Sequence, residues 1–255
     1  MKKTENVNIV LLALLRELHL PAIRECFEDT ARRAEKEELG YERYLLELAE
    51  RECEARRINR VERLLRESRL PLEKNHDTLD LKRLPQKIAR QYSTLREGAF
   101  LDRRENLLVF GKPGTGKSHL VCAIGNEQVR RGRRVFFATC GLLVQDLLLA
   151  KRELRLAKLL KRLSRFDALI IDDIGYVQQN REEMEVLFTL LSERYESGSI
   201  LLTSNLPFSK WDAIFKDPMT TAAAIDRLVH HSIILELNVP SYRAEQAKNR
   251  KDKEV

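Results

Sequence analysis

The chain has 255 residues, of which 43% are hydrophobic and 33% charged, so it can bury the core of one large domain with a small appendage. Its net charge of +7 favours an anionic partner, and no apolar run approaches the roughly 20 residues of a membrane span. The four cysteines are widely spaced without a CxxC pair, which excludes a cysteine-based zinc site and indicates reduced thiols. These features predict a cytoplasmic protein that makes no contact with a membrane.

Residues 1–70 are predicted to form a small helical domain. Apolar residues recur at helical spacing in 10–18 and in 41–67, and Pro21 suits the first turn of a helix between them. Arg56, Arg60 and Arg63 share one helix face, with glutamates interleaved along the helix. Both a salt-bridged surface and a DNA-binding face fit this pattern. Residues 71–98, with two prolines and mixed polarity, are predicted to be a connector.

Residues 99–240 are predicted to form an α/β domain, because short apolar strands alternate there with helical patterns. The predicted strands are 107–110, 135–138, 168–171, 200–203 and 233–237. The predicted helices are 117–131, 142–163 and 182–196. Such alternation implies a mostly parallel sheet covered by helices on both faces. Residues 241–255 are predicted to be a polar tail.

A glycine-rich phosphate-binding loop lies between the first predicted strand and the helix after it. The sequence fits GxxxxGK[ST] and consists of Gly111, Lys112, Pro113, Gly114, Thr115, Gly116, Lys117 and Ser118. Glycines let the loop curl so that backbone N–H groups and the helix N-terminus face the phosphates. Lys117 is predicted to reach the β- and γ-phosphates, and the Ser118 hydroxyl to ligate Mg²⁺. ATP and Mg²⁺ are therefore the expected cofactors.

Two further strands end in polar residues that complete a nucleotide site. Asp172 and Asp173 follow a buried strand, as a Walker B element requires. Asp172 is predicted to hold Mg²⁺ through water, and Asp173 to orient or deprotonate the attacking water. Asp173 is one methylene shorter than a glutamate, which favours slow hydrolysis. Asn205 ends the polar triplet after the fourth strand, where it can position the water or contact the γ-phosphate.

The ordered motifs, followed by Ala224-Ile-Asp-Arg-Leu228, resemble AAA+ ATPases, in particular the branch of IstB transposition proteins and DnaC helicase loaders. Residues 50–60 and 66–71 resemble the N-terminal helical domain of IstB proteins, which favours that family. The resemblance implies that Asn205 is sensor 1 and that Arg227 is an arginine finger acting on a neighbouring subunit's ATP. A surface arginine paired with Asp226 is the alternative. Few residues follow 233–237, so little or no lid domain is expected.

A basic stripe is predicted along the helix 142–163 and just beyond it. Its members recur at steps of three and four and are Lys151, Arg155, Lys158, Arg162 and Arg165, reinforced by Arg152 and Lys161. A second stripe, with Leu149, Leu156, Leu160 and Leu163, suits packing on the domain. Glu153 is the only acid between Lys151 and Arg165, whereas a solvated face normally mixes signs. The stripe is therefore predicted to bind DNA phosphates, with an ordinary charged surface as the alternative.

The motifs and the basic stripe predict an ATP-dependent, DNA-binding ATPase. The resemblance implies that it is an AAA+ protein that assembles on DNA as a ring or helical homo-oligomer. By resemblance, it assists a cognate transposase in target-site selection and strand transfer, with slow, DNA-stimulated ATP hydrolysis. A DnaC-like helicase loader is the nearest alternative. A second alternative, from another class of protein, is a non-hydrolysing DNA-binding scaffold. A small-molecule P-loop kinase is disfavoured, because no acceptor-binding region is evident.

Overall fold

The computed structural model describes residues 2–175, 181–211, 214, 218–242 and 245, and these divide into two compact units. The first unit spans residues 1–63 and the second begins at Leu64. The second unit contains every strand found among these described residues and the phosphate-binding loop, so it carries the predicted nucleotide site.

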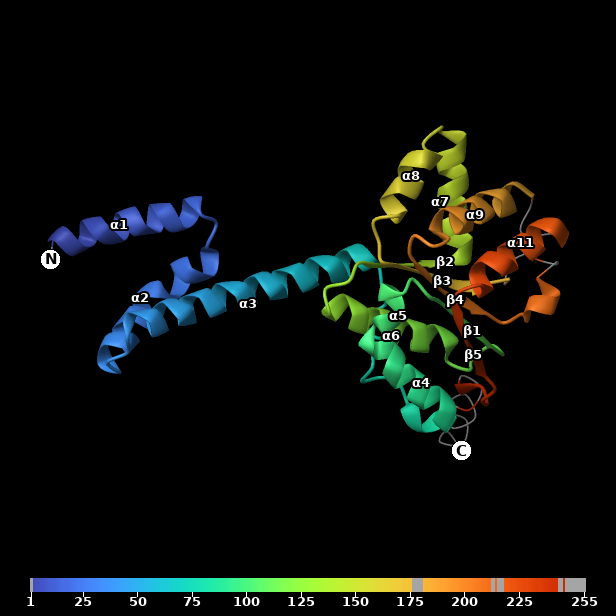
Figure 1. Ribbon diagram of the computed structural model, residues 1–255, viewed down its shortest axis with the longest axis horizontal. Helices are drawn as coiled ribbons and strands as arrows, with labels where there is room; N and C mark the ends of the chain where they lie inside the picture. Colours follow the sequence, from blue (N-terminus) through green and yellow to red (C-terminus); the bar gives the residue numbers. More distant parts are fainter. Residues whose placement is uncertain (1, 176–180, 212–213, 215–217, 243–244, 246–255) are drawn as a thin grey trace, which may run out of the picture. The chain divides into compact units, whose positions relative to one another are not determined.

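The first unit is helical, as predicted. It consists of α1 (Lys2–Glu17), α2 (Pro21–Lys36) and most of α3 (Tyr41–Ser68) (Figure 1). Its small core is built on the buried side chains of Leu15, Phe27 and Leu48. Pro21 occupies the first turn of α2, where its missing N–H costs no hydrogen bond.

A carboxylate of α3 caps the N-terminus of α2. Glu52 Oε2 accepts hydrogen bonds from the backbone N–H groups of Ala22 (2.9 Å) and Ile23 (3.3 Å). Arg56 Nε lies 2.8 Å from the other Glu52 oxygen, and Arg56 Nη2 donates to the His19 carbonyl at 2.8 Å. Arg56, one of the three arginines on the predicted face, therefore takes part in holding the helices of this unit together.

The second unit is built on a five-stranded parallel sheet, which confirms the predicted fold class. The strands are β1 (Asn106–Gly111), β2 (Val135–Thr139), β3 (Ala168–Ile174), β4 (Ser199–Ser204) and β5 (Ser232–Leu237). Their order in the sheet is β2-β3-β4-β1-β5. β1 therefore lies between β4 and β5, and β3 lies next to β4.

Helices cover both faces of this sheet (Figure 1). One face packs against α4 (Gln86–Glu97), α5 (Ala99–Asp102) and α6 (Lys117–Arg130). The other face packs against α7 (Cys140–Arg152), α8 (Leu156–Leu163), α9 (Arg181–Arg194) and α11 (Pro218–Val229). Side chains alternate between the two cores along each strand. On β1, Leu107 and Val109 belong to the core with α6, whereas Leu108 and Phe110 belong to the core with α7.

The prediction of one long helix over 142–163 is wrong, because the helix ends at Arg152 and α8 begins at Leu156. Leu154 adopts a left-handed conformation with φ 56°. Its N–H bonds the Lys151 carbonyl at 3.1 Å, and the Arg155 N–H bonds the Ala150 carbonyl at 2.7 Å. This pair of bonds is a Schellman motif, which ends a helix. Figure 1 shows α7 and α8 side by side, so the seven basic residues do not form one straight stripe.

The segment predicted as a connector, 71–98, contains the short 3₁₀ helix η1 (Leu81–Arg83) and α4. Ile88, Tyr92 and Leu95 of α4 are buried, because they face α6 and the sheet. The apolar positions on α4 follow a helical period that the mixed polarity of the surrounding residues obscures. This segment is therefore part of the core of the second unit.

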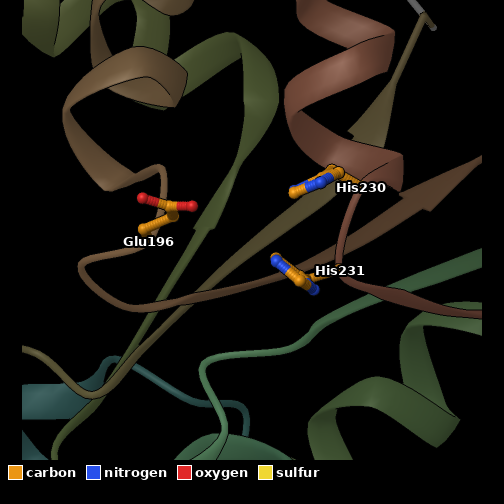
Figure 2. A group of neighbouring side chains, drawn as sticks. All are labelled: Glu196, His230 and His231. Carbon is orange, nitrogen blue, oxygen red and sulfur yellow. The ribbon is translucent and has the colours of Figure 1, made fainter.

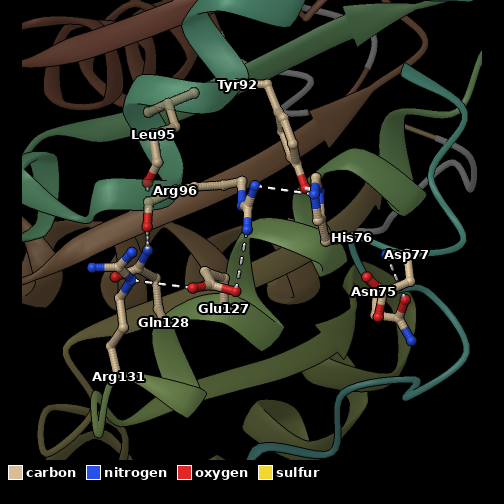
Figure 3. Close-up of polar contacts among 9 residues, drawn as sticks. All are labelled: Asn75, His76, Asp77, Tyr92, Leu95, Arg96, Glu127, Gln128 and Arg131. Atoms are coloured by element: carbon tan, nitrogen blue, oxygen red, sulfur yellow. Dashed lines mark hydrogen bonds and ion pairs between the residues drawn. The ribbon is translucent and has the colours of Figure 1, made fainter. Parts of the chain in front are cut away.

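Polar contacts hold α4 and the loop before it onto α6 (Figure 3). Gln128 Nε2 donates to the Arg96 carbonyl at 2.9 Å, and Arg96 Nη1 lies 3.1 Å from His76 Nε2. His76 Nδ1 lies 3.0 Å from the Tyr92 hydroxyl. Tyr92 is fully buried, and its burial raises the pKa of the phenol to about 12. The hydroxyl is thus protonated at neutral pH, and its contact with His76 joins the loop before α4 to that helix.

Arg194 stabilises the second unit from inside. Its side chain is 2% exposed and donates to the carbonyls of Phe166 (2.8 Å), Ser199 (3.1 Å) and Asp167 (3.2 Å). These carbonyls come from the segment between α8 and β3 and from the start of β4. Burial lowers the pKa of the guanidinium to about 10, which leaves it charged at neutral pH. One side chain thus satisfies polar backbone groups that tertiary packing removes from water.

Replacing Arg194 with methionine should lower the free energy of unfolding by about 2–4 kcal/mol. The aliphatic part is retained, but several buried carbonyls lose their donor, and each such loss costs about 1–3 kcal/mol, offset in part by removal of a buried charge. Urea titration measures the change. Arg32→Met is the matched control, because Arg32 is exposed and its replacement should cost within about 0.5 kcal/mol. Equal stability of the two variants would refute the role of Arg194.

Candidate nucleotide-binding site

Three neighbouring strands, β3, β4 and β1, end at the same edge of the sheet. The phosphate-binding loop follows β1, Asp172 and Asp173 lie at the end of β3, and Asn205 follows β4. Ligands of parallel α/β sheets bind outside the carboxyl ends of the strands. The topology therefore brings together three motifs that are about 30 to 90 residues apart in the sequence.

The phosphate-binding loop is curled as the glycine pattern requires. Gly114 and Gly116 have φ values of 80° and 94°, a left-handed region that other residues rarely adopt. The Thr115 hydroxyl donates to the Lys112 carbonyl at 2.9 Å. Lys117 Nζ donates to the carbonyls of Gly111 (2.8 Å) and Lys112 (3.1 Å), and its side chain is 5% exposed. The lysine ammonium group is thus held at the concave side of the loop.

The two aspartates of β3 are joined through Thr203 of β4. The Thr203 hydroxyl donates to Asp172 Oδ1 at 2.6 Å and accepts the backbone N–H of Asp173 at 2.8 Å. The ladder between β3 and β4 is irregular between Ile171 and Ile174, and Asp173 has φ 62°. This left-handed backbone separates the directions of the two carboxylates, since Asp172 is buried and Asp173 is exposed and lines a cavity.

The motif residues surround a cavity of about 310 Å³, a volume within the range of small-ligand sites. The predicted residues that line it are Pro113, Gly114, Thr115, Gly116, Lys117, Ser118, Asp173 and Asn205. Gly111 and Lys112 form the base of the loop, and Asp172 lies behind Asp173 in the sheet. Asn205 Oδ1 is buried and has no hydrogen-bond partner among the described groups, so it remains available as an acceptor.

The segment predicted as a connector supplies another wall of this cavity, which sequence reasoning missed. Its contribution includes Lys74, Thr78, Asp80 and Arg83, with the apolar side chains of Leu79 and Leu84. Thr78 Oγ1 lies 3.0 Å from Nε2 of His119, the residue that follows the phosphate-binding loop. Burial lowers the pKa of His119, which favours the neutral form of the ring. Nothing in the mixed composition of 74–84 singles out these residues.

The chain also approaches the phosphate-binding loop after β5, where a polar tail was predicted. The Tyr242 N–H donates to the Gly114 carbonyl at 2.9 Å, and a Cβ on Gly114 would collide with the Ser241 hydroxyl. Arg83 lies 4.9 Å from the centroid of the Tyr242 ring and 2.6 Å from Glu245. These contacts tie the first residues after β5 to the site. The rest of the predicted tail, 243–244 and 246–255, lies outside the described residues.

Arg227 does not line this cavity. It lies on α11, where its guanidinium is 4.8 Å from the centroid of the Phe188 ring and Nη1 donates to the Ala223 carbonyl at 3.0 Å. It lines a second hollow, together with Arg103, Arg104, Asn106, Tyr195, Glu196 and His231. An action of Arg227 on ATP therefore requires the nucleotide of another subunit.

The basic residues around α8 also lie away from the cavity, and some are paired. Lys151 Nζ is 2.9 Å from Glu185, Arg152 is 3.8 Å from Glu182, and Arg155 pairs with Glu153. The remaining four are exposed and form no ion pair with a described carboxylate: Lys158, Lys161, Arg162 and Arg165. Leu149, which was predicted to pack on the domain, is 57% exposed; it lies on α7, whereas the other three leucines of its predicted stripe lie on α8.

Comparisons with known proteins agree with this architecture. The sequence pattern of the family described as IstB-like ATP binding protein matches residues 13–250. An insertion-sequence ATP-binding protein of Sinorhizobium fredii is 42% identical over 92% of this chain and 79% of its own length. The protein named as the ATP-binding protein of insertion sequence IS21 from Pseudomonas aeruginosa is 38% identical over 92% of this chain and 89% of its own.

Among solved structures, the DnaC helicase loader gives a TM-score of 0.56 at 18% identity, covering 66% of this chain and 98% of that one. AMPPCP-bound DnaA from Aquifex aeolicus gives 0.57 at 19% identity, covering 74% and 57%. The second unit thus has the fold of the AAA+ P-loop domains. The whole chain belongs to the family of IstB-like ATP-binding proteins. In the part of the chain that the structure describes, no helix has the length and apolar character needed to cross a membrane.

Proposed function

We propose that the chain is a Mg²⁺-dependent ATPase that binds DNA and assists a transposase. The observation that carries the ATPase part is that the phosphate-binding loop, Asp173 and Asn205 line the same cavity. The comparisons support nucleotide binding, since the insertion-sequence relatives are named as ATP-binding proteins. Turnover, DNA binding and the partner are proposals that rest on the residues discussed below.

In this proposal, each cavity residue has one task in ATP hydrolysis. Loop N–H groups and Lys117 bind the β- and γ-phosphates, and the apolar wall with Leu79 and Leu84 receives the base. Ser118 and, through water, Asp172 hold Mg²⁺, which neutralises charge that develops on the phosphates. Asp173 orients the attacking water, and the unpaired Asn205 oxygen lies where it can accept a hydrogen bond from that water.

The bridging Thr203 hydroxyl supports this division of roles. A carboxylate that already accepts a short hydrogen bond, as Asp172 does, is held in one orientation for the water shell of a metal ion. Asp173 receives its fixed backbone from the same hydroxyl and directs its side chain into the cavity. A scaffold with a purely structural nucleotide would have no need for a second carboxylate that is exposed to the cavity.

We propose that the exposed cations of α8 and of the turn after it form the DNA-binding site. Lys151, Arg152 and Arg155 would reinforce it when their ion pairs with glutamate break. Lys158, Lys161, Arg162 and Arg165 provide four positive side chains without a described ion-pair partner. Leu163 of the same helix is buried and Leu156 and Leu160 pack on the core, so the cations are held on a rigid element. Phosphate contacts of this kind provide affinity without reading the base sequence.

If each of these four cations neutralises one phosphate, the logarithm of the DNA affinity should fall against log[salt] with a slope of roughly −3.6 per subunit. Replacing Lys158 and Arg162 with alanine should reduce the slope by roughly 1.8 and weaken all sequences alike. Binding of labelled duplex DNA at several salt concentrations measures both quantities. The ion-paired Lys151 and Arg152 form the matched control pair, whose replacement should change the slope less.

The competing DNA site is the arginine face of α3. A double replacement of Arg56 and Arg60 tests it. Arg56 also bonds the His19 carbonyl and Glu52. We therefore expect this variant to lose some stability in the first unit but to keep its salt slope. Loss of DNA binding in the folded variant, with an unchanged slope in the Lys158/Arg162 variant, would transfer the DNA site to α3.

The transposase is proposed as partner because the relatives belong to insertion sequences. A replicative helicase is the second candidate, favoured by the similarity of the fold to the DnaC helicase loader. Co-purification of the full chain with ATP, DNA and the product of the neighbouring gene should recover a transposase. Recovery of a helicase instead would identify a helicase loader. In either case we propose that the protein acts in the cytoplasm as a nucleotide-dependent homo-oligomer.

A further inference from the structure

Two turns at the edge of the sheet opposite the nucleotide cavity present a carboxylate and two imidazoles to each other (Figure 2). Glu196 lies in the turn between α9 and β4, and His230 and His231 lie between α11 and β5. One ligand atom from each of the three side chains lies within 4.8 Å of the others. The first of the two histidines comes three residues after Arg227, and no role assigned above uses any of the three side chains.

We propose that Glu196, His230 and His231 form a binding site for a divalent transition metal of the zinc class. Zinc accepts two histidines and one glutamate as ligands, with a fourth position for water, at metal–ligand distances of about 2.0–2.2 Å. Donor atoms around such a tetrahedral ion lie roughly 3.3–3.6 Å apart. All three side chains are exposed, so rotation about their side-chain bonds can bring the donors from 4.8 Å to this separation.

The backbone on both sides of the site is already fixed, which reduces the ordering cost of binding a metal. Asn106 N–H bonds the His231 carbonyl at 2.7 Å, and His230 N–H bonds the Asp226 carbonyl at 2.9 Å. Across the site, Arg104 Nη1 donates to the Glu196 carbonyl at 2.5 Å. The metal would therefore connect two turns that each have their own hydrogen bonds to the domain.

An outer hydrogen bond of the kind found around metal-binding histidines is also present. The Tyr195 hydroxyl lies 3.0 Å from His230 Nδ1, and such contacts orient the ring of a ligating histidine. The positive charges of Arg104 and Arg227, which line the same hollow, repel a divalent cation. The charge of Arg103 is compensated by Glu105, which lies 2.8 Å away. Mg²⁺, which depends on oxygen ligands and their charge, fits this site poorly; a metal that bonds to imidazole nitrogen fits it.

Metal binding would also act on α11. The ion would tie the C-terminal end of this helix, just after Val229, to the turn that follows α9. Because Arg227 lies in the last turn of α11, the metal would restrict the orientation of this arginine toward a neighbouring subunit. This consequence rests on the arginine-finger role proposed for Arg227, whereas metal binding itself does not.

The test uses the untagged full-length chain, stripped with a chelator and free of nucleotide. Titration with Co²⁺ should give the visible absorption of a tetrahedral ion, Zn²⁺ should displace it, and excess Mg²⁺ should not. His230→Asn and His231→Asn should each weaken Zn²⁺ binding by more than roughly 10–100-fold, which is the typical effect of losing a group that only hydrogen-bonds a metal ligand. Saturating Zn²⁺ should raise the Tm of the wild-type chain by roughly 5–10 °C at a hundredfold excess over Kd.

His19→Asn is the matched control, because His19 is exposed in the other unit and its left-handed backbone (φ 54°) suits asparagine. This variant should bind Zn²⁺ like the wild type. Unchanged Zn²⁺ affinity in a His230→Asn/His231→Asn double variant would overturn the proposal, as would the absence of a Co²⁺ spectrum in the wild type. These readouts need no ATP, so they remain informative if the chain proves not to hydrolyse nucleotide.

Discussion

Replacing Arg227 with alanine should reduce ATP turnover by roughly 10³–10⁵-fold while leaving ATP binding intact, because arginine fingers stabilise charge only in the transition state. The structure places Arg227 on α11, outside the nucleotide cavity of its own chain. In the proposed role, Arg227 therefore acts on ATP bound by a neighbouring subunit. Steady-state phosphate release and equilibrium nucleotide binding, both measured on the purified variant, separate the two effects.

Mixing experiments test the action between subunits directly. A Lys117→Ala chain lacks the main side-chain cation for phosphate but keeps an intact Arg227, so alone it should neither bind nor hydrolyse ATP. Mixed with Arg227→Ala, it should restore part of the activity at interfaces that join an intact loop to an intact arginine. No recovery at any ratio, in mixtures shown to form mixed oligomers, would exclude the proposed role. Arg131→Ala, on the other face of the sheet, is the matched control and should keep wild-type turnover.

Replacing Asp173 with asparagine should lower turnover by roughly 10²–10⁴-fold, the range for loss of a group that handles a proton or positions water. ATP binding should persist, because the phosphate-binding loop and Asp172 are unchanged. The asparagine amide has nearly the same shape as the carboxylate. Asparagine also tolerates the left-handed backbone at this position. We therefore expect the folded variant to accumulate in its ATP-bound form, which nucleotide analysis of the purified oligomer would reveal.

Thr203 offers a second approach to the same carboxylates. Thr203→Ser keeps the hydroxyl that joins Asp172 and Asp173 and should retain turnover, whereas Thr203→Val removes it and should lower turnover. Asp77→Asn, at an exposed carboxylate outside the cavity, is the matched control for Asp173→Asn and should keep wild-type turnover. Wild-type turnover in Asp173→Asn would remove Asp173 from catalysis. Equal turnover in the two Thr203 variants would show that the hydroxyl bridge does not position the aspartates.

The sequence alone was sufficient to predict the strands of the sheet and the order of the motifs along the chain. All five strands lie where short apolar runs predicted them, because a strand buried on both faces must be apolar at nearly every position. The phosphate-binding loop and the β3 aspartates were equally readable, since their chemistry requires particular residues at fixed spacing. Family membership followed from the same motifs and is confirmed by the match over residues 13–250.

Tertiary structure decided the features that depend on contacts between distant residues. The break at Leu154 was missed because the helical period continues through it, and only a non-glycine residue in a left-handed conformation marks the end of α7. The wall formed by residues 74–84 has no sequence signal, because its position comes from bonds such as those of Thr78 to His119 and Gln128 to Arg96. Thr203 was visible only as a polar residue after an apolar strand until the sheet order placed it beside Asp172. The approach of Glu196 to two histidines more than thirty residues away likewise exists only in the fold, since Arg194 and the parallel register bring their two turns to one edge of the sheet.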